Sequence, residues 1–144
     1  MTNLVLYAKD IVEREFLSMT SETNALEAAK QMSEKRHGFA IIISEGKPIG
    51  IVTEWDYLSK IVAQQRNPAD IRLNEIMSRN IVTVKASDGI DYVSKLMAER
   101  GIRRVLVLDK EKILGIITAK TVLSRLEDYI NSVSSQIARL QSPV

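Results

Sequence analysis

The sequence predicts an α+β protein in which two tandem strand-helix-strand-strand-helix repeats pack around a pseudo-twofold axis, with an extended C-terminal helix. The run from Gly50 to Thr53 recurs 65 residues later, from Gly115 to Thr118. Apolar positions elsewhere keep the same offset without a gap, and an apolar stripe at helical spacing continues beyond the second copy. One supersecondary unit used twice explains this pattern. Because neither small sheet buries both of its faces alone, we expect the two units to pack on each other.

The first repeat, predicted to span residues 1–65 with an N-terminal lead-in, is bounded by turn and capping residues. A helical turn is expected over 10–15, and polar residues from Thr20 to Asn24 cap a helix whose apolar side chains recur at helical spacing. That helix ends near Gly38 with basic residues in its last turn, as the helix dipole and the C-cap prefer. Strands are expected at 16–19, 39–43 and 49–52, the last two as a hairpin.

The second repeat, predicted to span residues 66–127, follows a polar connector at 63–74 in which Pro68 is a stop signal. The connector is too short to join freely moving domains. The order of elements repeats, with a helix expected at about 88–99 and strands at 81–84, 105–108 and 113–117.

Residues 128–144 form a predicted C-terminal helical extension. Apolar residues step by three and four along the last helix, as they do at the a and d positions of a coiled coil: Leu123, Leu126, Ile130, Val133, Ile137 and Leu140. Two alternatives stay open at this point. The arm folds back on its own domain, or the stripe forms a seam with a second chain.

The composition is that of a globular protein with an aliphatic core. Of 144 residues, 45% are hydrophobic and only 5% aromatic. No stretch approaches the roughly 18 apolar residues of a membrane span, and the N-terminus lacks the features of a signal sequence. The absence of Cys fits a reducing compartment, so we expect a cytoplasmic protein that has no membrane partner. A net charge of +2 is too small to predict nucleic acid as a partner.

The residue inventory also argues against catalysis. The chain has no Cys and a single His, His37, so it lacks most of the residues that a zinc site or a Ser-His triad needs. The carboxylates show no spacing that marks a shared catalytic site. We therefore expect a protein that binds a ligand without turnover and that uses neither a metal nor a cofactor.

The segment from Gly50 to Asp56 lies where a buried strand is expected to run straight into a helix. A helix N-terminus offers unpaired amide donors and a positive dipole, which suit a phosphate group, and the Thr53 hydroxyl adds a donor. A carboxylate one turn later, Asp56, can accept hydrogen bonds from two ribose hydroxyls. The alternative needs no ligand, because Thr53 as N-cap and Asp56 three residues later form a capping box.

These features resemble the tandem cystathionine-beta-synthase (CBS) domain pairs, the regulatory adenosine-nucleotide sensors of many enzymes and transporters. The resemblance rests on the duplicated unit, on the Gly-x-x-Thr-x-x-Asp pattern at Gly50, Thr53 and Asp56, and on the run from Gly101 to Asp109. It covers about residues 10–127, which is most of the chain. Because members of this family usually dimerise into flat discs, the resemblance also implies a homodimer.

The resemblance implies a ligand cleft that combines both repeats. Carried over position by position, the resemblance implies that Thr53 contacts a phosphate and that Asp56 contacts the ribose. It implies three cations around the phosphates, Arg103, Arg104 and Lys120. The apolar residues beside the adenine are then Ile51, Ile81 and Val82. Independently of the family, two consecutive arginines at the start of a strand are costly to bury without an anion. The alternative for them is a solvated strand edge.

The symmetry-related cleft departs from the family pattern. Thr121 stands where the ribose-binding acid is expected, and Gly38 and Phe39 stand at the positions that match the two arginines. This second cleft keeps Thr118, with His37 and Arg36 nearby, and we expect it to bind adenosine ligands weakly or not at all. We interpret His37 as a helix-end residue in preference to a ligand-binding residue.

The expected function is that of a stand-alone regulatory module. An adenosine ligand, with AMP, ADP or ATP ahead of S-adenosylmethionine, is expected to bridge the repeats and to act by ligand-linked conformational change on an unknown protein partner. The alternative is an accessory module for nucleic acid or protein assembly whose clefts do not bind nucleotide.

Overall fold

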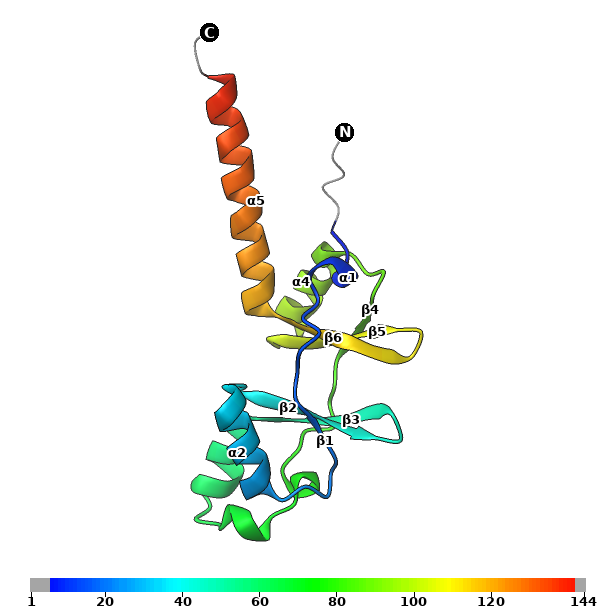
Figure 1. Cartoon of the computed structure of the whole chain (residues 1–144), viewed down its shortest axis with the longest axis vertical. Coiled ribbons are helices and arrows are strands. Elements are labelled where there is room, and N and C mark those ends of the chain that lie inside the picture. The colour runs from blue at the N-terminus through cyan, green and yellow to red at the C-terminus, as the bar shows by residue number, and fades with distance from the viewer. Residues whose placement is uncertain (1–5, 142–144) are drawn as a thin grey trace.

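Two copies of one small α+β unit stack in the computed structural model, which describes residues 6–141 (Figure 1). The first unit contains β1 (Ser18–Met19), α2 (Ala25–Lys35), β2 (Phe39–Ser44), β3 (Lys47–Thr53) and α3 (Glu54–Tyr57). The second contains β4 (Thr83–Lys85), α4 (Ile90–Arg100), β5 (Arg104–Asp109), β6 (Lys112–Thr118) and α5 (Ala119–Leu140). A short helix, α1 (Ala8–Ile11), comes first, and a π-helical turn (Leu58–Val62) and two 3-10 turns (Pro68–Asp70 and Leu73–Glu75) join the units.

The internal duplication predicted from the sequence is confirmed element by element. The helices α2 and α4, the strands β2 and β5, and the strands β3 and β6 begin and end at positions 65 residues apart. Each hairpin also has a register shift at the equivalent place, after Ile42 in the first unit and after Val107 in the second. The predicted α+β fold of two tandem repeats with a long C-terminal helix is therefore correct.

Each unit has a three-stranded sheet, in the order β1-β2-β3 or β4-β5-β6. The first strand pairs in parallel with the second, and the second and third form an antiparallel hairpin. Alternate side chains of β2 point to opposite faces: Ala40 and Ile42 join the core beneath α2, while Ile41 joins Leu106 and Ile116 in an apolar cluster between the two sheets. Burial on both faces explains why this strand is continuously apolar.

The segments that lead into each repeat pack against the other one. Ala8 and Ile11 of α1 belong to the core of the second unit, whereas Ile71 and Leu73 belong to the core of the first. The helical turn expected at 10–15 ends at Ile11, because the chain beyond it extends to pair with β6. The division of the chain at residues 65 and 127 stays a prediction, and the packing of the lead-in segments crosses it.

Glycines in the two repeats mark where a lead-in segment crosses a strand. Glu13 exchanges backbone hydrogen bonds with Ile116, N–H to O at 2.9 Å in both directions, and Ser78 does the same with Ile51. A Cβ on Gly115 would fall on the carbonyl oxygen of Glu13, and a Cβ on Gly50 would lie 2.6 Å from the Sδ of Met77. The glycine of the Gly-x-x-Thr pattern is therefore needed for close approach of the backbone.

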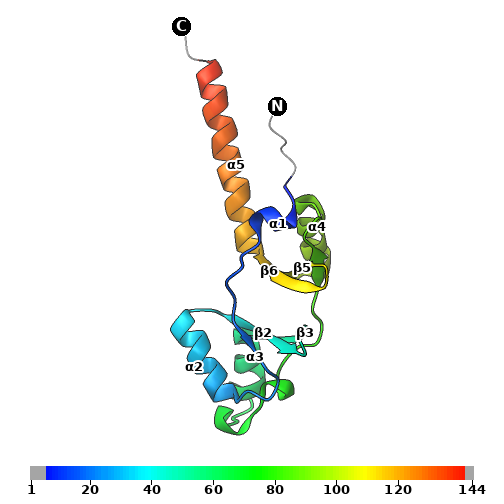
Figure 2. The same cartoon turned by 45° about the vertical axis from the view of Figure 1, so that its right-hand side comes forward.

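The last helix leaves the body of the protein. Only its first turns lie against α4 and β6, and its C-terminal part extends away from both sheets (Figures 1 and 2). None of its residues is buried. The alternative in which this arm folds back on its own domain is therefore wrong, while the end of the predicted extension at 142–144 lies outside the described residues. Between residues 6 and 141, no helix is both long enough and apolar enough to cross a membrane.

Candidate functional site

Thr53 and Asp56 form a capping box at the start of α3. The backbone N–H of Thr53 donates to Asp56 Oδ2 at 2.8 Å, and the Thr53 hydroxyl donates to the same oxygen at 3.2 Å. The other carboxylate oxygen, Oδ1, lies 2.9 Å from Lys60 Nζ, which also donates to the carbonyl of Ile76 at 2.7 Å. Three protein donors therefore hold the Asp56 carboxylate, as the alternative that needs no ligand predicted.

Asp56 is the one buried charged residue in the described part of the chain, with 6% of its surface exposed. An ionised carboxylate has about four lone-pair positions, so three donors leave room for about one more. The buried carboxylate is thus explained by structure alone, and a ligand hydroxyl can only be added to the existing set. Thr53 and Asp56 line neither of the cavities between the repeats.

In the second repeat, the acid beside the start of the helix comes from another segment of the chain. The hydroxyl oxygen of Thr118 accepts from the backbone N–H of Thr121 at 3.1 Å, and the Thr121 hydroxyl donates to Glu13 Oε1 at 2.8 Å. Glu13 is held there by its backbone pairing with β6. A carboxylate from the N-terminal segment therefore lies beside the position where the motif of the second repeat lacks one.

Five of the predicted nucleotide-binding residues come together in one small cavity between the sheets. The cavity has a volume of about 160 Å³, and its walls include Ile51 from β3, Ile81 and Val82 from the segment before β4, and the pair Arg103 and Arg104. Apolar side chains and arginines thus meet in one place, as the carried-over pattern predicted. The volume is below the roughly 300–1,000 Å³ typical of a cavity for a whole small ligand, so this cavity is large enough for only a part of a nucleotide.

A second cavity of about 560 Å³ is lined by the same two arginines and, apart from Thr53 and Asp56, by the remaining predicted residues. His37, Thr118 and Thr121 lie here, as expected for the second cleft. Lys120 also lies here and not beside Ile51, Ile81 and Val82. Lys120 is the second residue of α5, and Trp55 stands at the equivalent position in the first repeat.

This second cavity is strongly charged. Its cationic side chains outnumber its acidic ones: Arg36, Arg103, Arg104, Lys120 and Arg125 against Glu13, Glu15 and Glu54. With Arg103 and Arg104 in both walls, the two cavities adjoin. A cationic wall of this kind is suited to an anion that carries several negative oxygens.

Arg104 is the most constrained of these cations. Its guanidinium lies 4.8 Å from the ring centroid of Phe39, a cation–π contact. Burial lowers the pKa of Arg104, and the neighbouring charge of Arg103 adds to this effect, while Glu54 opposes it. Among the described residues, neither arginine forms an ion pair. The wall that the two cavities share therefore carries adjacent cations without a direct counter-ion.

His37 lies at the edge of the second cavity, after a left-handed residue, Arg36, that ends α2. Its ring stacks on Phe39 with centroids 6.4 Å apart. The Nδ1 atom is buried and has no hydrogen-bond partner in the described structure. The position fits the interpretation of His37 as a helix-end residue, and it also leaves one polar atom of the ring unsatisfied.

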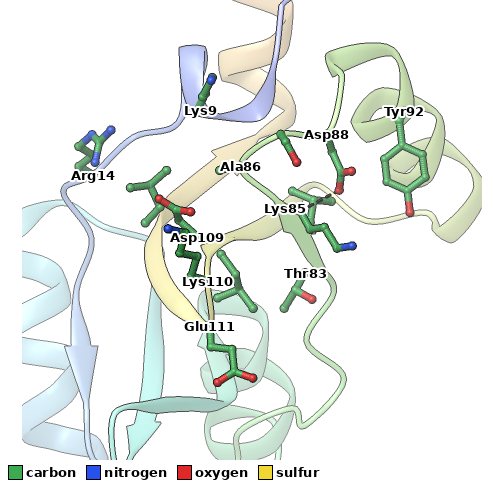
Figure 3. Close-up of a pocket in the computed structure, with 14 residues that line it drawn as sticks. Lys9, Arg14, Thr83, Lys85, Ala86, Asp88, Tyr92, Asp109, Lys110 and Glu111 are labelled. Carbon is green, nitrogen blue, oxygen red and sulfur yellow. Dashed lines mark hydrogen bonds between the residues drawn. The ribbon is translucent and has the colours of Figure 1, made fainter.

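A third and larger hollow, of about 880 Å³, lies on the outer side of the second repeat (Figure 3). Side chains of both signs surround it, among them Lys9, Arg14, Lys85 and Asp109. The Asp88 carboxylate is already used, since it accepts from the backbone N–H of Lys85 at 2.8 Å. None of the predicted site residues lies here, and the described residues contain no cluster of three His, Asp or Glu side chains able to hold a metal ion.

The sequence prediction missed the contribution of the N-terminal segment to the second cavity. Glu13 and Glu15 line it, and Arg125 of α5, which was not predicted either, does so too. A signal was present, because the 65-residue offset relates Glu13 and Glu15 to Ser78 and Asn80, in the segment that leads to Ile81 and Val82. Applied to the lead-in segment, the same symmetry places residues 13–15 in the second cleft.

Comparison with known proteins places this architecture among described ones. The family model for the CBS domain matches twice, at residues 8–63 and 73–128. An uncharacterized protein of Methanopyrus kandleri is 33% identical over 84% of this chain and 62% of its own length. The L-aspartate semialdehyde sulfurtransferase of Methanocaldococcus jannaschii is 31% identical over 88% of this chain but only 24% of its own length. The chain thus spans less than two thirds of these curated relatives.

Two solved structures show the same fold. One is a CBS domain pair in complex with 5′-methylthioadenosine and S-adenosyl-L-methionine, 31% identical, with a TM-score of 0.73 and coverage of 86% of this chain and 97% of that one. The other is a hexameric CBS-CP12 protein from bloom-forming cyanobacteria, 27% identical, with a TM-score of 0.77 and coverage of 98% and 88%.

Proposed function

This chain belongs to the CBS domain family, and we propose that it is a regulatory module that binds an adenosine ligand between its two repeats. The observation that carries the proposal is the pair of adjacent arginines in the wall between the two cavities, of which Arg104 is partly buried without an ion pair. Two guanidinium groups in this position are stabilised by an anion, and the phosphates of AMP, ADP or ATP supply one.

The two cavities together suggest how such a ligand lies. The smaller cavity, lined by Ile51, Ile81 and Val82, takes the adenine, because its apolar walls suit a flat base. The phosphates then reach Arg103 and Arg104 and extend toward the larger cavity, where Lys120 also lies. In this proposal one ligand occupies one site per chain, and the larger cavity receives its charged end.

The proposal does not depend on Asp56 and Thr53. The Asp56 carboxylate has about one accepting position left for a ribose hydroxyl, but it lines neither cavity, so the proposal does not depend on this contact. The neighbour that is bound to 5′-methylthioadenosine and S-adenosyl-L-methionine supports an adenosine moiety as the common part of the ligand. The arginine pair favours a ligand with phosphates over either of those two compounds.

The proposed mechanism is linkage between ligand and conformation. A ligand held by β3 of one repeat and by the start of β5 of the other stabilises one relative placement of the two sheets. A partner protein that prefers this placement binds more tightly when the ligand is present, and by reciprocity it strengthens ligand binding. We propose binding without turnover and self-association as a homodimer, and the hexameric neighbour supports self-association in this fold.

A thermal-shift panel tests the proposal. AMP, ADP, ATP, GTP, 5′-methylthioadenosine and S-adenosylmethionine are added to the wild type, to Arg104→Gln and to a control, Arg139→Gln, whose side chain is exposed near the end of α5. At 100 times its dissociation constant, a ligand adds about 2.7 kcal/mol, which raises the midpoint by roughly 5–10 °C in a protein of this size.

The expected result is a shift by at least one adenine nucleotide that Arg104→Gln loses and Arg139→Gln keeps. A wild type that responds to none of the ligands contradicts the proposal, as does an Arg104→Gln variant that responds fully. Binding of an oligonucleotide with steep salt dependence, and no response to free nucleotide, favours the accessory-module alternative.

A further inference from the structure

The helix α5 carries an apolar stripe that the described chain leaves largely uncovered. Leu123 is 67% exposed and Leu126 51%, although both stand near the base of the helix. Further along, Ile130 is 53% exposed, Ile137 49% and Leu140 86%. Scattered exposed apolar residues are ordinary, but a continuous row of them along one helix marks an interaction surface.

The helix has little support from its own chain. Val122 packs into the core of the second repeat, and Arg125 Nη2 donates to the carbonyl of Asp10 at 3.1 Å. These contacts hold the first two turns, while the part that follows extends away from the body (Figures 1 and 2). Beyond Arg125 the helix continues to Leu140. An isolated helix of about 15 residues is only marginally stable in water, and most helices in proteins gain their stability from burial of an apolar face.

The stripe has the spacing and the residue types of a two-stranded seam. The alternating steps of three and four place Leu123, Ile130 and Ile137 at a positions and Leu126, Val133 and Leu140 at d positions. β-Branched residues at a together with leucine at d favour a parallel dimer, and four of the six positions follow this rule, whereas Leu123 at a and Val133 at d do not. No charged residue stands at a or d, and the charged side chains Glu127, Asp128 and Arg139 lie outside the seam.

A second copy of this chain fits the stripe better than a membrane surface does. The rest of the helix beyond Arg125 is mainly uncharged and rich in serine, and its two acidic residues, Glu127 and Asp128, outnumber its one basic residue, Arg139, whereas helices that lie on membranes have a basic polar face. Covering six side chains on each of two helices, at roughly 100 Å² each, removes about 1,200 Å² from water. That area is at the lower end of stable specific interfaces.

We infer that α5 pairs with α5 of a second copy of this chain as a parallel, in-register, two-stranded coiled coil. The surface is separate from the cavities between the repeats, so the inference holds or fails independently of the nucleotide proposal. The two bodies then lie at the same end of the coil.

The first test is the mass of the full chain in solution. Multi-angle light scattering over a concentration series is expected to give twice the chain mass of 16.2 kDa for the wild type. The double variant Ile130→Glu/Ile137→Glu places charges in the seam and is expected to be monomeric. The control Asn131→Glu/Ser135→Glu adds the same charge at exposed positions outside the seam and is expected to remain a dimer.

The second test fixes the orientation. Because the chain has no cysteine, a single Val133→Cys forms a disulfide with itself only where two helices run parallel and in register. Mild oxidation is expected to cross-link Val133→Cys completely and to leave Ser135→Cys, on the outer face, uncoupled. A monomeric wild type, a dimer that survives Ile130→Glu/Ile137→Glu, or equal cross-linking of the two cysteine variants would overturn the inference.

Discussion

Replacement of Asp56 by alanine is expected to destabilise the fold even when no ligand is present. The carboxylate accepts from the Thr53 N–H at 2.8 Å, from the Thr53 hydroxyl at 3.2 Å and from Lys60 Nζ at 2.9 Å. Loss of a capping side chain costs about 0.5–2 kcal/mol, and loss of a hydrogen bond to a charged group about 1.5–3 kcal/mol. Lys60 limits the damage, because it is 43% exposed and keeps its bond to Ile76.

These contributions overlap, so we expect Asp56→Ala to lower the free energy of unfolding by about 2 kcal/mol and the thermal midpoint by about 4–8 °C. Circular dichroism during urea and thermal unfolding measures both. The matched variant is Thr121→Ala at the equivalent position of the second repeat. It removes a neutral hydroxyl that donates to Glu13 at 2.8 Å, and we expect it to cost about 0.5–1 kcal/mol.

Equal losses in the two variants, or a loss below about 0.5 kcal/mol for Asp56→Ala, would refute the capping role derived from the geometry. The carboxylate would then be free for a ligand alone. If the capping role holds, a weaker thermal response of Asp56→Ala to nucleotide reports stability as well as binding. Variants of the arginine pair are therefore the cleaner probes of the cleft.

Three more outcomes follow from the described contacts. Gly115→Ala is expected to lose about 1–3 kcal/mol in urea unfolding because its Cβ falls on the Glu13 backbone, and Gly50→Ala less, since its nearest neighbour is the flexible Met77; equal losses would contradict this. Burial raises the pKa of Tyr57 to about 12. Because the unfolded chain loses this proton first, the contribution of Tyr57 to the free energy of unfolding is complete below a pH of about 10 and falls between about 10 and 12. Urea unfolding midpoints from pH 8 upward should decline in the wild type and not in Tyr57→Phe. A chain ending at residue 127 should keep its nucleotide response in the thermal-shift panel, and loss of that response would connect α5 to the cleft.

The fold was predictable because the duplication has no gap. Strands β2 and β5 each contain a continuous apolar run, 39–43 and 105–108, and each is followed by a turn and a hairpin partner at the same spacing. Where the pattern of one repeat is ambiguous between helix and strand, the equivalent segment of the other repeat decides the prediction. The exchange of lead-in segments was not predictable in this way, since Ile11 and Ile76 signal only that they are buried and not in which repeat.

The candidate site was predicted in part for a physical reason. Ile51, Ile81, Val82, Arg103 and Arg104 gather because each stands at a strand end or in a lead-in segment beside the interface of the two sheets. Lys120 lines the second cavity together with Arg103 and Arg104 and does not line the first, so its predicted place near the phosphates stays a prediction. The contact between Glu13 and Thr121 was not predicted, because the two residues lie 108 positions apart in the sequence.

The central claim is that one nucleotide binds per chain against the arginine pair. Titration calorimetry of ATP, ADP and AMP into the wild type and into Arg103→Gln/Arg104→Gln tests it most directly. The account predicts one binding event per chain for at least one of the three nucleotides, and at least a tenfold weaker affinity in the variant, which corresponds to about 1.4 kcal/mol or more. Two equivalent sites per chain, or an affinity that the double substitution leaves unchanged, would contradict it.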